Sequence, residues 1–280
     1  FDRHGERKSR AKARMKFLMA KVGLDGFKAL VEEQRIAVPY TSVAIDAAGY
    51  AQPVIANVTD IPSVTIKDQK AFEQWKATNL IPQKQAGFVA IGIKVLLGDF
   101  YTDKARLLAD LVDKYAAGEV RLTLRQNIVI PHVKEELIEV VYAELEKLGF
   151  VQAGYNKAVD ITACPGTDTC NLGIASSTGI AEELEKVIAA EYPQYLSNED
   201  LVIKISGCMN ACGQHNMANI GFQGMTVRTK DKLVAPALQV LLGGGNLGNG
   251  EARFADKVVK IPSKRGPEAL RKILNDYDAN

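Results

Sequence analysis

The sequence is poor in cysteine, histidine and aromatic residues, and it has no long apolar run. Its 280 residues include four Cys, three His and one Trp. No stretch offers about 18 uncharged apolar residues, so we expect no membrane-spanning helix and no membrane partner. The first residues lack the apolar core of a secretory signal peptide, which favours a cytoplasmic location. With 47% hydrophobic and 24% charged residues, the composition excludes collagen and long disorder and fits one or two folded domains.

The sequence also lacks an initiating methionine, because it starts at Phe1. We therefore do not expect Phe1 to be the native start, and the length alone leaves open whether the chain is a whole protein or a piece.

Positive charge is unevenly distributed along the chain. The net charge is only +2, yet residues 1–21 hold eight Lys and Arg against two acids, and the remainder is mildly acidic. Such an asymmetry indicates an anionic partner. Nucleic acid, a membrane surface and a polyanionic ligand held in the fold all satisfy it.

The four cysteines form two pairs in one part of the chain. Cys164 and Cys170 are spaced C-x5-C, Cys208 and Cys212 are spaced C-x3-C, and 37 residues separate the pairs. Without an export signal, a bound metal or cluster is favoured over disulfides. Four thiolates suit zinc, but zinc pairs are usually spaced C-x2–4-C. An iron–sulfur cluster tolerates wider spacing, so the pattern favours a cluster and leaves zinc open.

Hydrophobic periodicity predicts a helix over 6–36, interrupted at Gly23, and short strands with extended connections over 37–80. We expect Trp75, in that connector, to be a packing residue. The next segment has the order β-α-β-α, which favours half of a ferredoxin-like sandwich. Its elements are predicted at 87–98, 102–118, 119–133 and 134–149.

The last 130 residues alternate strands and helices again. Strands 159–164 and 201–208 lead directly into the cysteine pairs, so both pairs are predicted on loops at strand ends. Further strands are predicted at 219–228 and 258–262, and helices at 178–192 and 267–277. The glycine run 243–248 has G-x-G-x-x-G spacing, but no helix follows it, so a turn is predicted rather than a dinucleotide site. The predicted fold class is α+β, a ferredoxin-like half-domain followed by a mixed α/β domain.

The cysteine segments resemble a known family. DITACPGTDTCNLG (160–173) and IKISGCMNACGQHNMANIGFQG (203–224) are similar to the paired signature of the sirohaem-dependent nitrite and sulfite reductases. The resemblance continues through RLTLRQNIVIPHV (121–133), the basic opening RAKARMKFLMAKVG (10–23) and LLGGGNLGNGE (241–251). It covers in effect the whole chain, but only the second half of the family's length.

This resemblance implies two cofactors, a [4Fe–4S] cluster and sirohaem. The cluster ligands would be the four cysteines, and the sulfur of Cys212 would also bind the sirohaem iron. Sirohaem carries eight carboxylates, for which Arg is the strongest partner. The residues expected around it are Arg10, Arg14, Lys16, Arg125, Gln126, Asn127 and Asn210.

The resemblance also implies an enzyme that reduces nitrite to ammonia or sulfite to sulfide with six electrons. Gln214 after the last Cys–Gly favours nitrite slightly, and the electron donor would be ferredoxin or a flavoprotein. In the family, the Arg and Lys that hold the substrate anion come from the first half. The resemblance therefore implies a truncated fragment or one subunit of a split enzyme, with the missing N-terminal half as the expected partner.

The expected division has four parts: the end of a preceding sirohaem domain (1–37), a connector (38–80), a ferredoxin-like half-domain (81–151) and the sirohaem and [4Fe–4S] domain (152–280). Three alternatives stay open. One is a sulfite reductase haemoprotein. Another is a subunit that holds a cluster but needs a partner for catalysis. The third is a zinc-stabilised module whose basic N-terminal helix binds nucleic acid, although the main interpretation has no nucleic-acid partner.

Overall fold

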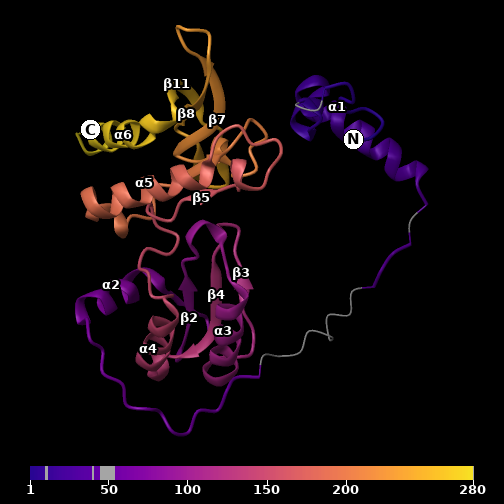
Figure 1. Ribbon diagram of the computed structural model, residues 1–280. Helices are drawn as coiled ribbons and strands as arrows, with labels where there is room; N and C mark the ends of the chain where they lie inside the picture. Colours follow the sequence, from indigo (N-terminus) through magenta and orange to yellow (C-terminus); the bar gives the residue numbers. More distant parts are fainter. Residues whose placement is uncertain (10–11, 40, 45–53, 280) are drawn as a thin grey trace. The chain divides into compact units, whose positions relative to one another are not determined.

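A computed structural model describes residues 1–9, 12–39, 41–44 and 54–279. The chain divides into two compact units, Phe1–Gln52 and Pro53–Asn280. Figure 1 shows the helices and strands of each unit. Among the described residues, no helix combines the length and the apolar character needed to cross a bilayer.

The described part of the first unit contains one kinked helix, α1 (Met15–Ala37). Gly23 adopts φ 73° and ψ 173° within it, which confirms the predicted interruption. The prediction that the helix starts at residue 6 is wrong. The Glu6 carboxylate accepts the N–H groups of Lys8 (2.6 Å) and Ser9 (3.2 Å), which is a turn arrangement that competes with helix. The helix starts at Met15, after Arg14 in an extended conformation.

The N-terminal layer of the second unit, residues 69–151, is a four-stranded antiparallel sheet with three helices. The strand order is β1-β2-β4-β3. Its core includes Trp75, which is fully buried, as the packing role predicted for it requires. The elements are α2 (Gln69–Asn79), β1 (Leu80–Pro82), β2 (Phe88–Ile93), α3 (Thr102–Tyr115), β3 (Arg121–Leu122), β4 (Ile128–Lys134) and α4 (Ile138–Leu148).

Two predictions for this layer are wrong. Residues 69–79 form α2 instead of extended chain, and the Asp68 carboxylate caps this helix by accepting the N–H of Ala71 at 2.9 Å. Residues 119–133 form a hairpin, β3–β4, instead of one strand. The turn closes through Thr123, whose carbonyl accepts the N–H of Gln126 at 3.2 Å, and Gln126 has a φ of 67°.

The C-terminal layer, residues 154–279, is a mixed five-stranded sheet with the order β11-β8-β7-β6-β5, flanked by α5 and α6. Strands β5, β6 and β7 are parallel, while β8 and β11 are antiparallel to their neighbours. The structure confirms the predicted α+β class. The elements are β5 (Thr162–Ala163), α5 (Ser177–Glu191), β6 (Ile203–Ser206), β7 (Ile220–Arg228), β8 (Val234–Leu242), β9 (Gly245–Gly248), β10 (Glu251–Arg253), β11 (Asp256–Pro262) and α6 (Gly266–Ala279).

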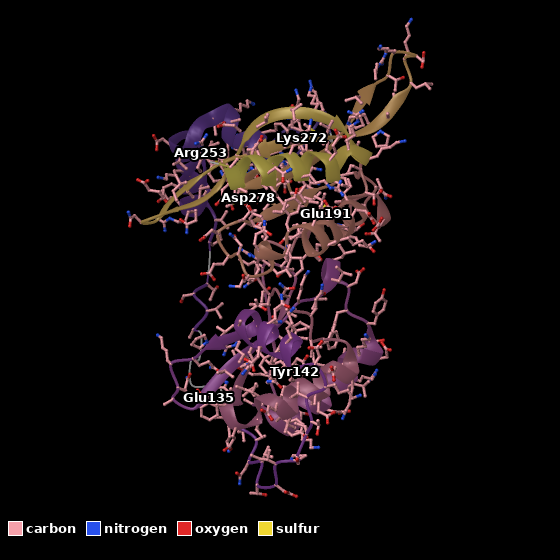
Figure 2. The ribbon with its side chains drawn as sticks, turned by 90° about the vertical axis from the view of Figure 1, so that its left-hand side faces the viewer. Glu135, Tyr142, Glu191, Arg253, Lys272 and Asp278 are labelled. Atoms are coloured by element: carbon pink, nitrogen blue, oxygen red, sulfur yellow. The ribbon has the colours of Figure 1, made fainter. Side chains whose placement is uncertain are left out.

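Figure 2 shows the side chains of both layers, with Tyr142 in the N-terminal layer and Glu191 and Asp278 in the C-terminal layer. Each layer has its own apolar core. The two layers are joined by buried polar contacts and by Leu97, which packs against the core of the C-terminal layer.

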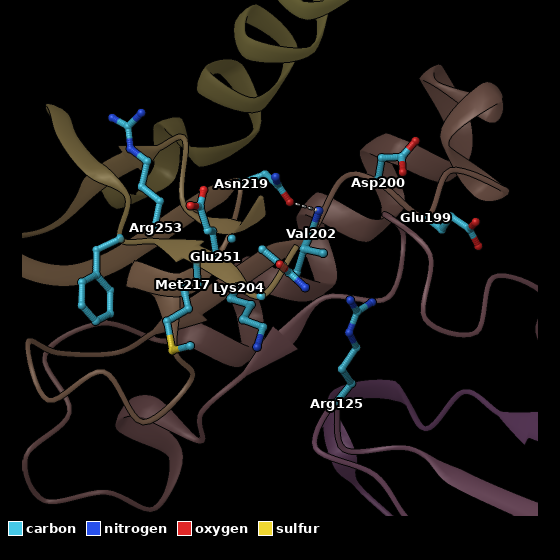
Figure 3. Close-up of a pocket in the computed structure, with 14 residues that line it drawn as sticks. Arg125, Glu199, Asp200, Val202, Lys204, Met217, Asn219, Glu251 and Arg253 are labelled. Atoms are coloured by element: carbon cyan, nitrogen blue, oxygen red, sulfur yellow. Dashed lines mark hydrogen bonds between the residues drawn. The ribbon is translucent and has the colours of Figure 1, made fainter. Parts of the chain in front are cut away.

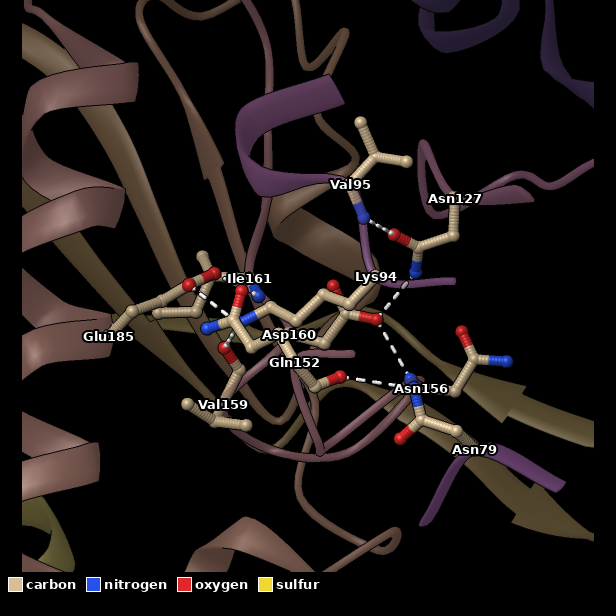
Figure 4. Close-up of polar contacts among 10 residues, drawn as sticks. All are labelled: Asn79, Lys94, Val95, Asn127, Gln152, Asn156, Val159, Asp160, Ile161 and Glu185. Carbon is tan, nitrogen blue, oxygen red and sulfur yellow. Dashed lines mark hydrogen bonds and ion pairs between the residues drawn. The ribbon is translucent and has the colours of Figure 1, made fainter. Parts of the chain in front are cut away.

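The first of these contacts is a buried ion pair (Figure 4). Lys94 follows β2, its side chain has no solvent exposure, and its Nζ lies 2.7 Å from Oε2 of Glu185 on α5. The same Nζ donates to the carbonyl of Val159 at 2.8 Å. The other Glu185 oxygen accepts the N–H of Ile161 at 3.0 Å. Burial raises the pKa of Glu185, and Lys94 opposes that shift.

The second contact runs through Asn127, which is 1% exposed. Its Oδ1 accepts the N–H of Val95 at 2.9 Å, and its Nδ2 donates to Oδ2 of Asp160 at 2.5 Å (Figure 4). Asp160 also accepts the N–H of Asn156 at 2.8 Å. Burial raises the pKa of Asp160, against the lowering effects of Lys94 and these hydrogen bonds. Asn127 therefore ties the turn before β4 to the chain that leads into β5.

Candidate metal centre

The two cysteine pairs leave adjacent parallel strands at the same edge of the sheet. Ala163, the last residue of β5, is paired with Ile205 of β6, and Cys164 follows immediately. The N–H of Cys164 donates to the carbonyl of Ile205 at 3.2 Å. Strand β6 ends at Ser206, two residues before Cys208. Because the carboxyl ends of parallel strands share one edge, both loops begin side by side, as the strand-end prediction requires.

Gly207 connects the two cysteine loops through hydrogen bonds of its backbone. Its N–H donates to Sγ of Cys164 at 3.1 Å, and its carbonyl accepts the N–H groups of Ile174 (2.9 Å) and Ala175 (3.0 Å). A Cβ atom at position 207 would lie 2.7 Å from Cα of Gly166. Cβ atoms essentially never come that close to another heavy atom, so no side chain fits there. Glycine is therefore required for the first loop to pack on the start of the second.

Ser177, the first residue of α5, lies next to Cys164. It is fully buried, and its Oγ donates to the carbonyl of Cys164 at 2.6 Å. The same Oγ lies 3.5 Å from Sγ of Cys164. Amide and hydroxyl groups around a cysteine sulfur stabilise its thiolate and tune the potential of a metal bound to it.

The second loop has a less common backbone. Ala211 and Gln214 adopt φ values of 60° and 58°, which are sparsely populated by residues other than glycine. The N–H of Gly213 donates to Oγ of Ser206 at 3.0 Å and turns the loop back over β6. Oδ1 of Asn210 is buried and, among the described residues, has no hydrogen-bond partner. That unsatisfied oxygen fits a residue that faces a bound group.

All four cysteines are free thiols. Cys208 is buried, Cys164 is partly exposed, and Cys170 and Cys212 are exposed. Within the part of the chain that the structure describes, no three His, Cys, Asp or Glu side chains surround a common point. The structure thus starts the two cysteine loops at one edge of the sheet, without bringing the described cysteines together as a ligand set. The thiol donors, the N–H directed at Cys164 and the glycine contacts all fit an iron–sulfur cluster.

The turn before β4 contacts the first cysteine loop directly. Nε2 of Gln126 donates to the carbonyl of Ala163 at 2.9 Å, and its Oε1 accepts the N–H of Ala163 at 3.1 Å. Nη1 of Arg125 donates to the carbonyl of Asn156 at 2.8 Å. Three residues of this turn are expected near sirohaem. Two of them, Gln126 and Asn127, use their side-chain amides for hydrogen bonds between the layers. Arg125 keeps its remaining donors directed into a cavity.

The remaining predicted residues belong to the first unit. Arg10 lies outside the described residues. Arg14 and Lys16 are both exposed, at the start of α1, and Nζ of Lys16 lies 5.4 Å from the ring centroid of Phe17.

Sequence reasoning did not single out two residues of this site, Ser177 and Gly207. Their partner, Cys164, lies 13 and 43 residues away along the chain, so no local pattern marks their roles. Gly207, between Ser206 and Cys208, carried the one available signal, because a glycine directly before a cysteine indicates close backbone approach.

Two family profiles match the chain. Residues 81–148 match the profile described as "Nitrite/Sulfite reductase ferredoxin-like half domain", and residues 154–280 match "Nitrite and sulphite reductase 4Fe-4S domain". The second range contains all four cysteines.

Several curated proteins are similar to this chain. The ferredoxin–nitrite reductase of Synechococcus elongatus is 27% identical over 98% of this chain and 48% of its own length. The chloroplastic ferredoxin–nitrite reductase of Betula pendula is 30% identical over 86% of this chain and 38% of its own length. Sulfite reductase (ferredoxin) 1 of Mycolicibacterium paratuberculosis is 26% identical over 99% and 46%, respectively. The chain thus spans at most about half the length of these curated relatives.

Among solved structures, the Mycobacterium tuberculosis NirA protein superimposes with a TM-score of 0.64. The match covers 97% of this chain and 46% of that chain at 22% identity, which indicates a shared fold.

Proposed function

Because this chain belongs to the nitrite and sulfite reductase family, we propose that its two cysteine loops hold a [4Fe–4S] cluster within a nitrite- or sulfite-reducing enzyme. The observation that carries the proposal is the placement of the two cysteine pairs on neighbouring parallel strand ends, joined through Gly207. In this proposal residues 81–151 are the ferredoxin-like half-domain and 152–280 the cofactor domain. Residues 1–37 end a preceding domain, and 38–80 connect the two.

The proposed ligands are Cys164, Cys170, Cys208 and Cys212, and the Cys212 sulfur is the proposed link to the sirohaem iron. Cys164 and Cys208 stand at the strand ends, whereas Cys170 and Cys212 are exposed and free to turn toward a cluster. When bound, the coupled centre supplies single electrons in sequence, as a six-electron reduction requires. The protein's part is to hold the ligands, to donate the Gly207 N–H to one sulfur, and to fix the loops against the N-terminal layer.

We also propose that sirohaem binds against Arg125 and Asn210, and Arg10, Arg14 and Lys16 stay proposed as carboxylate-binding residues. The cationic donors suit carboxylates, and the buried Oδ1 of Asn210, which has no hydrogen-bond partner among the described residues, suits a site that faces a bound group. Gln126 and Asn127 belong to this proposed site as residues that hold its wall in place, through Ala163 and Asp160.

The proposed reaction reduces nitrite to ammonia, with sulfite to sulfide as the second substrate pair. Two of the relatives described above are named as ferredoxin–nitrite reductases and one as a sulfite reductase, which supports both anions, a slight preference for nitrite, and ferredoxin as the donor. Because the chain covers at most about half of those relatives, catalysis is proposed to need an N-terminal half that supplies the substrate clamp.

The test is purification under anaerobic conditions from cells that make sirohaem, with the chain produced alone and within the longer protein. We expect sirohaem absorbance bands and iron in the longer protein, together with turnover of nitrite faster than that of sulfite by reduced ferredoxin. A preparation that contains one zinc per chain, no iron and no sirohaem bands would overturn the proposal in favour of a zinc-stabilised module.

A further inference from the structure

A cavity of about 720 Å³ opens on the C-terminal layer beside β6 (Figure 3). Its walls come from β6, from the segment around Met217 and Asn219, from the β9–β10 hairpin, and from Arg125 in the turn before β4. Among the described residues that line it there is no cysteine. Its volume lies within the usual range of ligand pockets.

Two cations that line this cavity form no ion pair among the described residues, although the charge of Arg125 opposes the burial that raises the pKa of Asp160. Arg125 donates to the neutral carbonyl of Asn156 at 2.8 Å, and Nζ of Lys204 donates to the neutral Oε1 of Gln214 at 2.7 Å. Over the described part of the chain, neither forms an ion pair within 4.0 Å. Figure 3 shows Arg125 and Lys204 extending toward the same space from different elements.

The other charged groups of the lining provide a contrast. Arg253 is paired with Asp256, and Glu199 is paired with Lys157 at 2.7 Å. Each of these pairs carries little net charge, so it attracts a carboxylate less strongly than an unpaired cation does. Among the described residues of the lining, Arg125 and Lys204 are the cations without such a pair.

These two cations also repel each other. The pKa of Lys204 is lowered, first by burial and then by the positive charge of Arg125. Two like charges held together in a partly buried place are unfavourable unless an anion lies between them.

The rest of the lining restricts the kind of anion. Asp200 and Glu251 also face the cavity, so a ligand carboxylate is favoured beside Arg125 and Lys204 and disfavoured beside these two acids. Met217 and Phe254 line it with exposed apolar side chains, at 48% and 67% exposure. An apolar ring that carries carboxylates on its edge matches this mixture better than a small, fully hydrated anion.

We propose that Arg125 and Lys204 form a carboxylate-binding site in this cavity, suited to the edge of a carboxylate-bearing macrocycle. Lys204 is thereby assigned a ligand-binding role that nothing else about the chain suggests. The inference rests on the proposed function in one respect: the macrocycle considered is of the sirohaem type. The shared chemistry is the carboxylate, and a free small carboxylate or oxyanion is the other possible source.

The test measures ligand binding to the full 280-residue chain, prepared without iron or macrocycle. The probe is uroporphyrin, an iron-free porphyrin with eight carboxylates, and binding is followed by its fluorescence. We expect Lys204→Met and Arg125→Met each to weaken uroporphyrin binding about five- to tenfold at low salt, an effect that shrinks at 1 M salt. The matched control is Arg253→Met, in the same cavity but already paired, with a change below about twofold. Lys204→Arg keeps the charge and is expected to bind within about twofold of the unaltered chain.

Competition distinguishes the sources. Displacement of uroporphyrin by excess citrate or sulfite, at constant ionic strength, would assign the site to small anions as well; no displacement would assign it to the macrocycle edge. Either result, with loss in Lys204→Met, supports a carboxylate or oxyanion site. Unchanged binding in Lys204→Met, or equal losses in Lys204→Met and Lys204→Arg, would overturn the inference. Because the assay needs no cluster and no turnover, it can fail while the proposed reductase function stands, and the reverse.

Discussion

The two layers of residues 54–279 are built on different plans. The N-terminal layer is a fully antiparallel sheet, and its polar residues of interest occupy one turn, residues 123–127. The C-terminal layer has three parallel strands, β5, β6 and β7, so successive strand ends meet at one edge. The cysteine loops leave that edge. The difference supports a division in which the C-terminal layer carries the proposed ligands and the N-terminal layer supports their loops.

The direction of the contacts supports this division. Lys94, Gln126 and Asn127 of the N-terminal layer reach Glu185, Ala163 and Asp160, respectively. All three contacts fall on the chain before Cys164 or on the helix that follows its loop. If the division is correct, changes in the C-terminal layer should remove the cluster, and changes in the N-terminal layer should loosen its support.

The largest expected effect is from the cysteines. Cys164→Ser, Cys170→Ser, Cys208→Ser and Cys212→Ser should each lose most of the bound iron after anaerobic reconstitution, because a cubane needs four thiolate ligands. Iron and absorbance per chain are the measurements. The matched control is Ser176→Ala, which removes an exposed helix cap in the same segment and should keep its iron. Full iron retention in two or more of the serine variants would break the assignment.

The next effect concerns the buried ion pair. Lys94→Met leaves Glu185 buried without its partner, which should lower the free energy of unfolding by about 3–5 kcal/mol in denaturant titrations. Lys186→Met is the matched control. Lys186 is exposed on α5, the helix that also carries Glu185, and its pairs with Glu182 and Glu183 lie in solvent. Its loss should stay below about 1 kcal/mol. Similar losses of unfolding free energy in both variants would mean that the buried ion pair between the layers stabilises the chain no more than the exposed pairs do.

A smaller effect is expected from the amide of Gln126. Gln126→Ala removes two hydrogen bonds to Ala163 and should cost about 1–3 kcal/mol, because both backbone groups lose their partner. The sharper readout is amide hydrogen exchange in the reduced, metal-free chain. Exchange at Ala163 and Cys164 should speed up, while Gln85→Ala, an exposed change in the same layer, should leave it unaltered. Unchanged exchange in Gln126→Ala would show that the N-terminal layer does not hold the first loop.

The smallest effect is a pH dependence at Asp160. Burial raises its pKa above 3.8, so its contribution to stability is present at low pH and is lost as the pH rises through the raised value. Asp160→Asn can still accept from Asn127 and Asn156 but does not ionise. We therefore expect the melting temperature of Asp160→Asn, relative to the unaltered chain, to rise between pH 4 and pH 7. A relative melting temperature that is flat or falls over that range would contradict the assigned direction.

Much of the fold could be predicted from the sequence, because the hydrophobic periodicity and the Gly and Pro residues that end elements agree with the structure in most elements. Helices α3, α4 and α5 and the strands that precede the cysteines appear where periodicity places them. Strand β8 was not predicted from the sequence. Pro236 interrupts the strand-like sequence pattern, and the last residues of the strand are buried on both faces and show no alternation. The β3–β4 turn was missed because it contains neither glycine nor proline, and Gln126 takes the positive φ itself.

The candidate site was predictable only where sequence neighbours carry it. The cysteine spacing and the strand ends are local, so they could be found. The pairing of Gln126 with Ala163 spans 37 residues, and the approach of Lys204 to Arg125 joins separate layers. No pattern in one sequence encodes such contacts, because they depend on how two independently folded cores pack.

The edge formed by β5 and β6 is proposed to hold one four-iron cluster. This proposal is tested by the iron, acid-labile sulfide and zinc content of the chain after anaerobic reconstitution, combined with Mössbauer spectroscopy. We expect about four iron and four sulfide per chain, with a spectrum typical of a [4Fe–4S] cluster. One tightly bound zinc per chain, with iron and sulfide absent, would contradict it.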